Sequence, residues 1–320
     1  MMPAIITHDQ FGQEALSLPE VPVTTTRQER DAFLLGCQGP DPFFYLLICP
    51  GLSDDKRDIG NRMHAETPTR LLAAMSRSVE RASASSRRVA SAYAGGFLCH
   101  YLLDRSAHPF VYAQQYAYCD AGIEGLTRED GNVVHSVIET ELDELMLYTR
   151  TGQTIATYAP NREILRLDDD ALAIVSRQMA GVVKEVYGEY IAPSLFATAV
   201  RCFRIVQTLC YSPTGAKREV LGKIEQAVRP YSYVMSMSHR PVVMTESIFD
   251  NHAHLSWTDP FSGEVRDESF QDLYDLAMVD ASAYLAPFMA GKVGFAEARA
   301  ITHGLDFSGK RAESLEELEG

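Results

Sequence analysis

The sequence lacks any apolar run that could cross a lipid bilayer. Its longest apolar stretch, around residues 43–49, is well short of the roughly 18 residues that a spanning helix needs. The first residues, MMPAIITHDQFGQ, contain neither a basic segment nor a long apolar segment, so no secretory signal is predicted. We therefore expect a cytoplasmic protein with no transmembrane segment.

Regularly spaced cysteines and an excess of basic residues are also missing. The six cysteines form no CxxC pair and no framework spacing, which favours reduced, buried thiols over disulfides. Lys and Arg total 29 against 43 Asp and Glu, which gives a formal net charge of −14. An acidic balance disfavours binding to nucleic acid or to an anionic membrane, so no stable nucleic-acid partner is expected.

Helical periodicity dominates what is present, and no segment is rich in strand signals. Thr67 and Pro68 form a helix start signal, whereas Pro40 and Pro42 predict a loop around Asp41. Pro109 predicts the end of the preceding helix near His108. The predicted helices cover residues 24–38, 68–82, 85–108, 132–148, 168–188, 194–211 and 268–291, with a loop-like segment at 239–267 and a charged, frayed tail at 310–320.

The pattern predicts an all-α fold, a multi-helix bundle around a clustered metal site. Residues 1–150 are expected to form the ligand-bearing helical core, and residues 151–320 a helical remainder packed on the same domain. Gly95 and Gly96 lie inside a predicted helix, where each costs about 1 kcal/mol relative to Ala, so they indicate a close backbone approach beside the site. Oligomeric state is left open, because apolar helix faces serve either a core or a partner.

The metal-site prediction rests on residues 96–139. His100 and Asp104 are four residues apart, a spacing that stacks two side chains on one helix face, and His108 follows one turn later. His135 and Glu139 repeat this spacing on a second predicted helix. Two facing helices therefore present five groups that bind divalent cations, all within apolar segments.

A bound cation would remove the cost of burying these carboxylates. An ionised carboxylate without a partner costs several kcal/mol in an apolar environment, so Asp104 and Glu139 are unlikely to be buried alone. Nitrogen and oxygen donors without thiolate suit catalytic zinc, whereas structural zinc is usually held by cysteine. We therefore interpret the stretch as a catalytic metal site.

Three upstream residues and three downstream histidines complete the candidates. Taken singly, His8 resembles a surface histidine and Asp41 a turn residue, while His64 falls just before a predicted helix. The aromatic residues that follow Asp41, at positions 43–45, are expected to pack in the core more often than to line a substrate cleft. Structural or surface roles are expected for His239, His252 and His254.

Taken together, these residues resemble the zinc-dependent phospholipases C of bacteria and, more distantly, the single-strand nucleases of the same fold. The ligand order in that family is His, Asp, His, HxxxD, His, HxxxE. This sequence matches it with His8, Asp41, His64, His100 and Asp104, His108, and His135 and Glu139. The match includes both fixed spacings and lies within residues 1–148.

The resemblance implies how two or three zinc ions would be held. One ion would lie on Asp41, His64, His100 and Asp104, and a second on His108, His135 and Glu139. A third would share Asp104 and use His8. Secreted members complete the third site with a processed N-terminal residue, and this chain begins Met-Met-Pro, so the number of ions stays open. The membrane-binding β-sandwich of the toxin members has no counterpart in the pattern of residues 151–320.

The implied activity is hydrolysis of a phosphoric ester by zinc-activated water, with a phospholipid or a small-molecule phosphoester as substrate. Asp41 is the carboxylate we expect to act as general base as well as ligand. Phosphomonoesterase or nuclease activity on the same site remains an alternative, as does a non-catalytic helical scaffold or binding protein. A phosphohydrolase of the HD type, suggested by His8-Asp9, and a ferritin-like di-iron protein, which would need ExxH pairs, fit the pattern less well.

Overall fold

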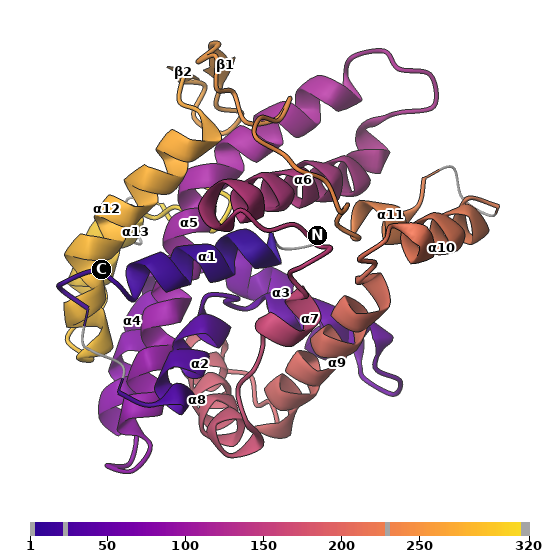
Figure 1. Ribbon diagram of the computed structural model, residues 1–320. Helices are drawn as coiled ribbons and strands as arrows, with labels where there is room; N and C mark the ends of the chain where they lie inside the picture. The colour runs from indigo at the N-terminus through magenta and orange to yellow at the C-terminus, as the bar shows by residue number, and fades with distance from the viewer. Residues whose placement is uncertain (1–3, 22–24, 228–230, 315–320) are drawn as a thin grey trace.

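The computed structural model describes residues 4–21, 25–227 and 231–314. Helix α5 (Arg87–Cys119), 33 residues long, runs through the middle of the molecule (Figure 1). Its residues Phe97, Leu98, Tyr101 and Leu102 are fully buried. The other helices pack around it, so the all-α prediction is confirmed, and the hydrophobic core is built on the same helix that carries three of the candidate ligands.

The remaining elements are short to medium helices and one small hairpin. The elements that precede α5 or directly follow it are α1 (Ile5–Ala15), α2 (Arg27–Gly36), η1 (Asp41–Ile48), α3 (Asp54–Ala65), α4 (Pro68–Arg81), η2 (Arg128–Asp130) and α6 (Gly131–Thr151). The later elements are α7 (Pro160–Glu163), α8 (Asp169–Tyr187), α9 (Ser194–Cys210), α10 (Ala216–Gln226), α11 (Tyr233–Ser236), β1 (Trp257–Thr258), β2 (Val265–Arg266), α12 (Phe270–Met289) and α13 (Phe295–Thr302). The antiparallel pair β1 and β2 lies in the segment expected to be loop-like.

Glycines allow α2 and α5 to pack in close contact. A Cβ on Gly96 would lie 1.9 Å from the carbonyl oxygen of Phe33, and one on Gly36 would lie 2.3 Å from that of Tyr93. A Cβ on Gly95 would lie 2.7 Å from the Met289 side chain. The predicted close approach is therefore confirmed, and it brings the end of α2 against the helix that carries His100.

Two predictions made from prolines were wrong. Pro109 does not end its helix, because α5 continues to Cys119 and buries Phe110 and Val111 beyond the proline. The Pro40 to Pro42 segment does not form an irregular loop but starts the 3-10 helix η1, with Pro42 in the first turn, where a missing N–H costs little. His64 lies just before the predicted helix, since α4 begins at Pro68, but it also belongs to the last turn of α3, a helix that was not predicted.

The C-terminal part of the chain packs back on the ligand-bearing helices. The prediction of a frayed tail is wrong for residues 310–314, because Glu313 is buried and its carboxylate accepts hydrogen bonds from the backbone N–H and hydroxyl of Thr69. The rest of that tail, residues 315–320, lies outside the described residues. The division of the chain at residue 150 stays a prediction.

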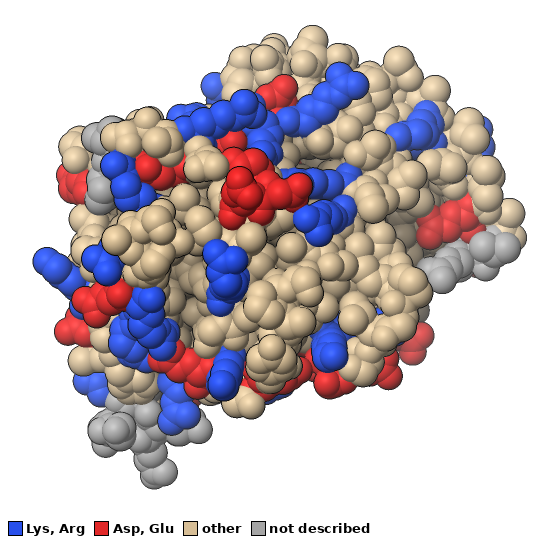
Figure 2. Space-filling view, turned by 90° about the horizontal axis from the view of Figure 1, so that it is seen from below, with Lys and Arg blue, Asp and Glu red and all other residues tan. Residues whose placement is uncertain are grey.

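The surface carries charges of both signs. Figure 2 shows acidic and basic side chains interspersed on the face that it presents. None of the helices among the described residues is long and apolar enough to cross a membrane.

Candidate metal centre

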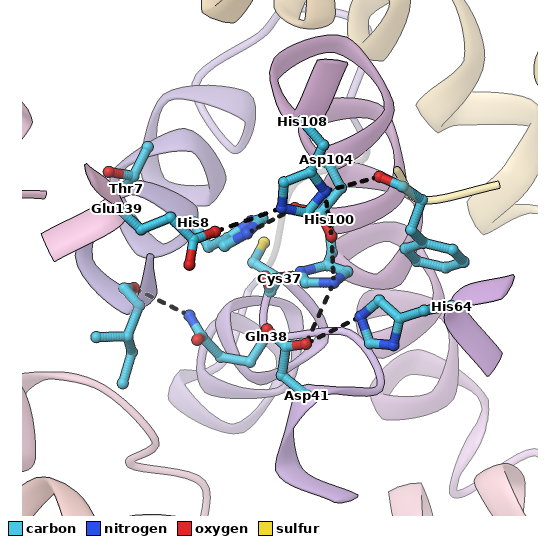
Figure 3. Close-up of polar contacts among 12 residues, drawn as sticks. Thr7, His8, Cys37, Gln38, Asp41, His64, His100, Asp104, His108 and Glu139 are labelled. Atoms are coloured by element: carbon cyan, nitrogen blue, oxygen red, sulfur yellow. Dashed lines mark hydrogen bonds and ion pairs between the residues drawn. The ribbon is translucent and has the colours of Figure 1, made fainter. Parts of the chain in front are cut away.

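Five elements bring the eight candidate ligands together. His8 comes from α1, Asp41 from the first position of η1 and His64 from the last turn of α3. The others lie on two helices, His100, Asp104 and His108 on α5, and His135 and Glu139 on α6. Figure 3 shows labelled histidines pointing toward the carboxylates of Asp41, Asp104 and Glu139. All are buried except His64, whose side chain is 12% exposed.

Within each of three groups, the possible ligand atoms lie within 4.8 Å of one another. One group contains Asp41, His64 and His100, and another His108, His135 and Glu139. The last contains His8, His100 and Asp104, so that His100 belongs to two groups. Separations of this size place three donors around one cation.

Asp104 lies at the junction of the groups. Its Oδ1 is 3.0 Å from Nε2 of His8, and its Oδ2 is 3.1 Å from Nε2 of His100. The same Oδ2 is 3.8 Å from Nδ1 of His108. One carboxylate therefore contacts residues of all three groups, which is the position a bridging ligand needs.

Backbone carbonyls fix the orientation of three ligand histidines. Nδ1 of His64 donates to the carbonyl of Gly60 at 2.7 Å, and Nδ1 of His100 to that of Cys37 at 3.1 Å. Nδ1 of His108 donates to the carbonyl of Phe307 at 2.8 Å. Since a carbonyl oxygen can only accept, each of these Nδ1 atoms carries the proton.

The fourth such histidine, His135, uses a side chain instead. Its Nδ1 lies 2.9 Å from Oε1 of Gln115. In all four rings the other nitrogen, Nε2, therefore points inward at a carboxylate or at open space between ligands. Metal-binding histidines typically have one nitrogen held by an outer acceptor and the other free for the ion.

Several atoms of the candidate ligands make no hydrogen bond. Four of these buried ligand atoms have no hydrogen-bond partner among the described residues: Nδ1 of His8, Nε2 of His100, Nε2 of His135 and Oε2 of Glu139. Nε2 of His100 and Nε2 of His135 lie 3.1 and 3.3 Å from carboxylate oxygens, but without hydrogen-bond geometry. Buried polar groups are nearly always paired, so a set of four orphans in one place calls for a missing partner. A cation satisfies nitrogen and oxygen lone pairs together, whereas water would satisfy them one at a time.

A small cavity adjoins these atoms. It has a volume of about 20 Å³ and is lined by His8, Asp104, His108 and Glu139, among others. A space of this size holds about one water molecule or ion. The donors, the orphaned atoms and the cavity therefore fit the binding of zinc.

The electrostatics of the site also favour a positive charge. Burial would lower the pKa of His108, but the nearby Asp104 and Glu139 carboxylates raise this pKa to about 10. Burial would raise the pKa of Glu139, but His135 and His108 lower it to about 2. Against burial, the surrounding histidines hold the pKa of Asp104 well below its usual range. Both carboxylates thus stay ionised and attract a cation.

Asp41 is positioned by an unusual turn. The preceding Gly39 has a φ of +49°, and a Cβ there would lie 2.1 Å from Cδ2 of His100. This turn brings Oδ1 of Asp41 to 3.0 Å from Nε2 of His64 and 3.9 Å from Nε2 of His100. Only glycine fits both the backbone conformation and the contact with His100.

Several residues that shape the centre had no signal in the sequence. Asp143 accepts hydrogen bonds from the backbone N–H groups of Ile6 and Thr7, at 3.0 and 2.7 Å, and so holds the start of α1 beside His8. Gln115 and the carbonyl of Phe307 orient His135 and His108. Because their partners are 20 to 199 residues away in the chain, no local spacing could have predicted these contacts.

The other predictions for single residues had mixed outcomes. His8 is not a surface residue, since it is only 4% exposed. His252 and His254 have side chains more than half exposed, as expected for surface residues, and His239 is buried with its Nε2 2.8 Å from Oδ2 of Asp143. Asp9 is in none of the three groups and accepts a hydrogen bond from Gln13, which leaves the HD interpretation without structural support.

Comparison with known proteins gives one match. A family model described as zinc dependent phospholipase C matches residues 7–195, which is more than half of the chain and includes all eight candidate ligands. The matched region extends past the motif-bearing residues into α8 and the start of α9. None of the curated proteins and none of the solved structures matches the chain.

Proposed function

Because the chain belongs to the zinc-dependent phospholipase C family, we propose that it is a zinc-dependent hydrolase that cleaves the head-group phosphodiester of a phospholipid. At the family level this is a phospholipid-cleaving hydrolase. The observation that best supports the proposal is the set of four histidines whose Nδ1 atoms are held by outer acceptors while their Nε2 atoms face the carboxylates.

The proposed ligand sets follow the three groups. Asp41, His64 and His100 would hold one zinc ion, with Asp104 as a further ligand. A second ion would be held by His108, His135 and Glu139. The group of His8, His100 and Asp104 supports a third ion. The number of ions stays a prediction, and residues 1–3, Met-Met-Pro, lie outside the described residues.

The chemistry divides between the zinc ions and the protein. Bound zinc would act as a Lewis acid on a phosphoryl oxygen and lower the pKa of water. Asp41, whose Oδ1 lies 3.0 Å from the partly exposed His64, is the carboxylate that would accept the proton from an attacking water as general base. Attack at phosphorus would break the bond to the glycerol oxygen, which takes up a proton. The products would be a diacylglycerol and a phosphorylated head group.

The role of Asp41 has a direct test. The Asp41→Asn protein, reloaded with zinc, is expected to keep most of its metal and to lose about 10²- to 10⁴-fold in kcat, the range for a missing general base. Full kcat at unchanged zinc content would remove Asp41 from that role. A panel of phospholipid, phosphomonoester and single-stranded DNA substrates would separate the proposed activity from its alternatives.

A further inference from the structure

An apolar groove of about 370 Å³ lies beside η1. Apolar side chains supply most of its wall: Phe44, Leu47, Ile48, Val206, Tyr233 and Met237. Arg57 and Asn132 add polar groups. A volume in this range with mostly apolar walls and few polar groups is typical of a small-molecule site.

The groove lies next to the metal centre. Phe44, which lines it, stacks on the ring of the candidate ligand His64, with centroids 5.0 Å apart and an interplanar angle of 26°. Ser136, which also lines the groove, is on α6, next to His135 in sequence and one turn from Glu139. A molecule in the groove would therefore extend from the edge of the centre at which His64 is exposed.

Tyr45 also lines the groove. Its ring is buried and stacks on Phe203, with centroids 4.0 Å apart. Burial, together with the nearby Asp41 carboxylate, raises the pKa of its hydroxyl well above the usual value, so the hydroxyl stays protonated.

The outer part of the groove is apolar although it faces solvent. Leu47 and Ile48 are 71% and 52% exposed, and Tyr233 is 39% exposed. These side chains are not buried in the hydrophobic core. Together they form an apolar rim of the groove, next to the polar metal centre. Arg57 adds a positive charge to the wall, and its guanidinium is held by the carbonyl of Cys49 at 3.2 Å and by Oδ1 of Asp54 at 3.5 Å.

We propose that this groove binds an acyl chain of the phospholipid substrate. The identity of the ligand rests on the proposed function, whereas the presence of an apolar site beside the centre does not. A phospholipid carries an apolar chain and a phosphodiester on one molecule. The groove offers apolar surface and the positive charge of Arg57, and through Phe44 it adjoins His64 of the metal centre.

The test uses a series of short-chain lysophospholipids that differ by one methylene, presented as phosphonate analogues whose head-group bond cannot be hydrolysed. Each methylene that enters the groove is expected to tighten the dissociation constant about fourfold, measured by titration calorimetry on the zinc-loaded protein. The L47N/I48N variant should lose most of this chain-length dependence. A matched control, L276N/V279N, changes two residues of α12 that are 50% and 67% exposed and should behave like the wild type.

A second assay measures hydrolysis of glycerophosphocholine, a diester without an acyl chain, by the wild type and by the L276N/V279N control, which should cleave it at the same rate. Dissociation constants that do not change with chain length, or that change equally in wild type and L47N/I48N, would overturn the groove proposal even if diesters are hydrolysed. Chain-length-dependent binding that L47N/I48N abolishes, without hydrolysis of any diester, would support the groove and refute the proposed function.

Discussion

Replacing Gly39 with alanine tests how the turn before Asp41 positions the centre. At a φ of +49°, an alanine costs about 1–2 kcal/mol in backbone strain. Its Cβ would lie 2.1 Å from Cδ2 of His100, and relieving such overpacking costs about 1–3 kcal/mol more. We therefore expect Gly39→Ala to lower the free energy of unfolding by about 2–5 kcal/mol.

Gly152→Ala is the matched control. Gly152 has a φ of +68°, but a Cβ there would meet no atom within 4 Å, so this variant carries the backbone strain alone. Urea unfolding of the metal-stripped proteins should show Gly39→Ala to be less stable than Gly152→Ala by about 1–3 kcal/mol. Because the clash displaces His100, Gly39→Ala should also bind at least one zinc ion fewer. Equal stabilities and equal zinc contents in the two variants would refute this reasoning.

Three further predictions concern the surroundings of the ligands. Asp143→Ala should loosen the start of α1, because it removes the hydrogen bonds to Ile6 and Thr7, and should therefore reduce the zinc content. The control Asp169→Ala, at an exposed aspartate, should keep the wild-type zinc content. Equal zinc contents in the two variants would contradict this role of Asp143. Gln115→Leu removes the hydrogen-bond partner of His135 and should weaken zinc binding by about 10–100-fold, as loss of a group that orients a ligand typically does. Competition with a chelator measures the zinc affinity, with Gln114→Leu as control. An unchanged affinity in Gln115→Leu would count against the orienting role of Gln115. In the metal-stripped protein, the raised pKa of His108 gives stability that is present below about 6.5 and lost as the pH rises toward about 10. The lowered pKa of Glu139 gives stability that is present above about pH 4.5 and lost as the pH falls toward about 2. Unfolding midpoints should therefore be highest between about pH 4.5 and 6.5, where both contributions are present. A midpoint that does not change with pH would be inconsistent with the pKa shifts.

Fold class could be predicted because helical periodicity is a local property. The long helices α6, α8, α9 and α12 were predicted to within a few residues. The missed helix α1 is short, and His8 within it looked like a surface residue because its burial depends on Asp143, more than 130 residues away. Pro109 was misjudged for a similar reason, since burial of Phe110 and Val111 outweighs the hydrogen bond that the proline removes.

The candidate ligands could be proposed from the sequence, because HxxxD and HxxxE place donors on one helix face without tertiary information. The residues that orient them could not. The carbonyl of Phe307, the amide of Gln115 and the contacts of Gly39 act through chain segments that become neighbours only on folding. The aromatic residues after Asp41 were expected to pack in the core more often than to line a substrate cleft, and Phe43 and Tyr45 are buried in the core. Phe44 and Tyr45 also line the apolar groove, which the sequence did not predict.

The most direct test of the metal centre is zinc, manganese and iron per chain, measured by elemental mass spectrometry on wild type and Asp104→Ala purified without added metal. Asp104 contacts residues of all three groups, so we expect two to three zinc ions in the wild type and a loss of more than one in the variant. Asp120→Ala, at the exposed end of the same helix, should keep the wild-type content. A wild type that contains no metal and takes up no added zinc would contradict the account.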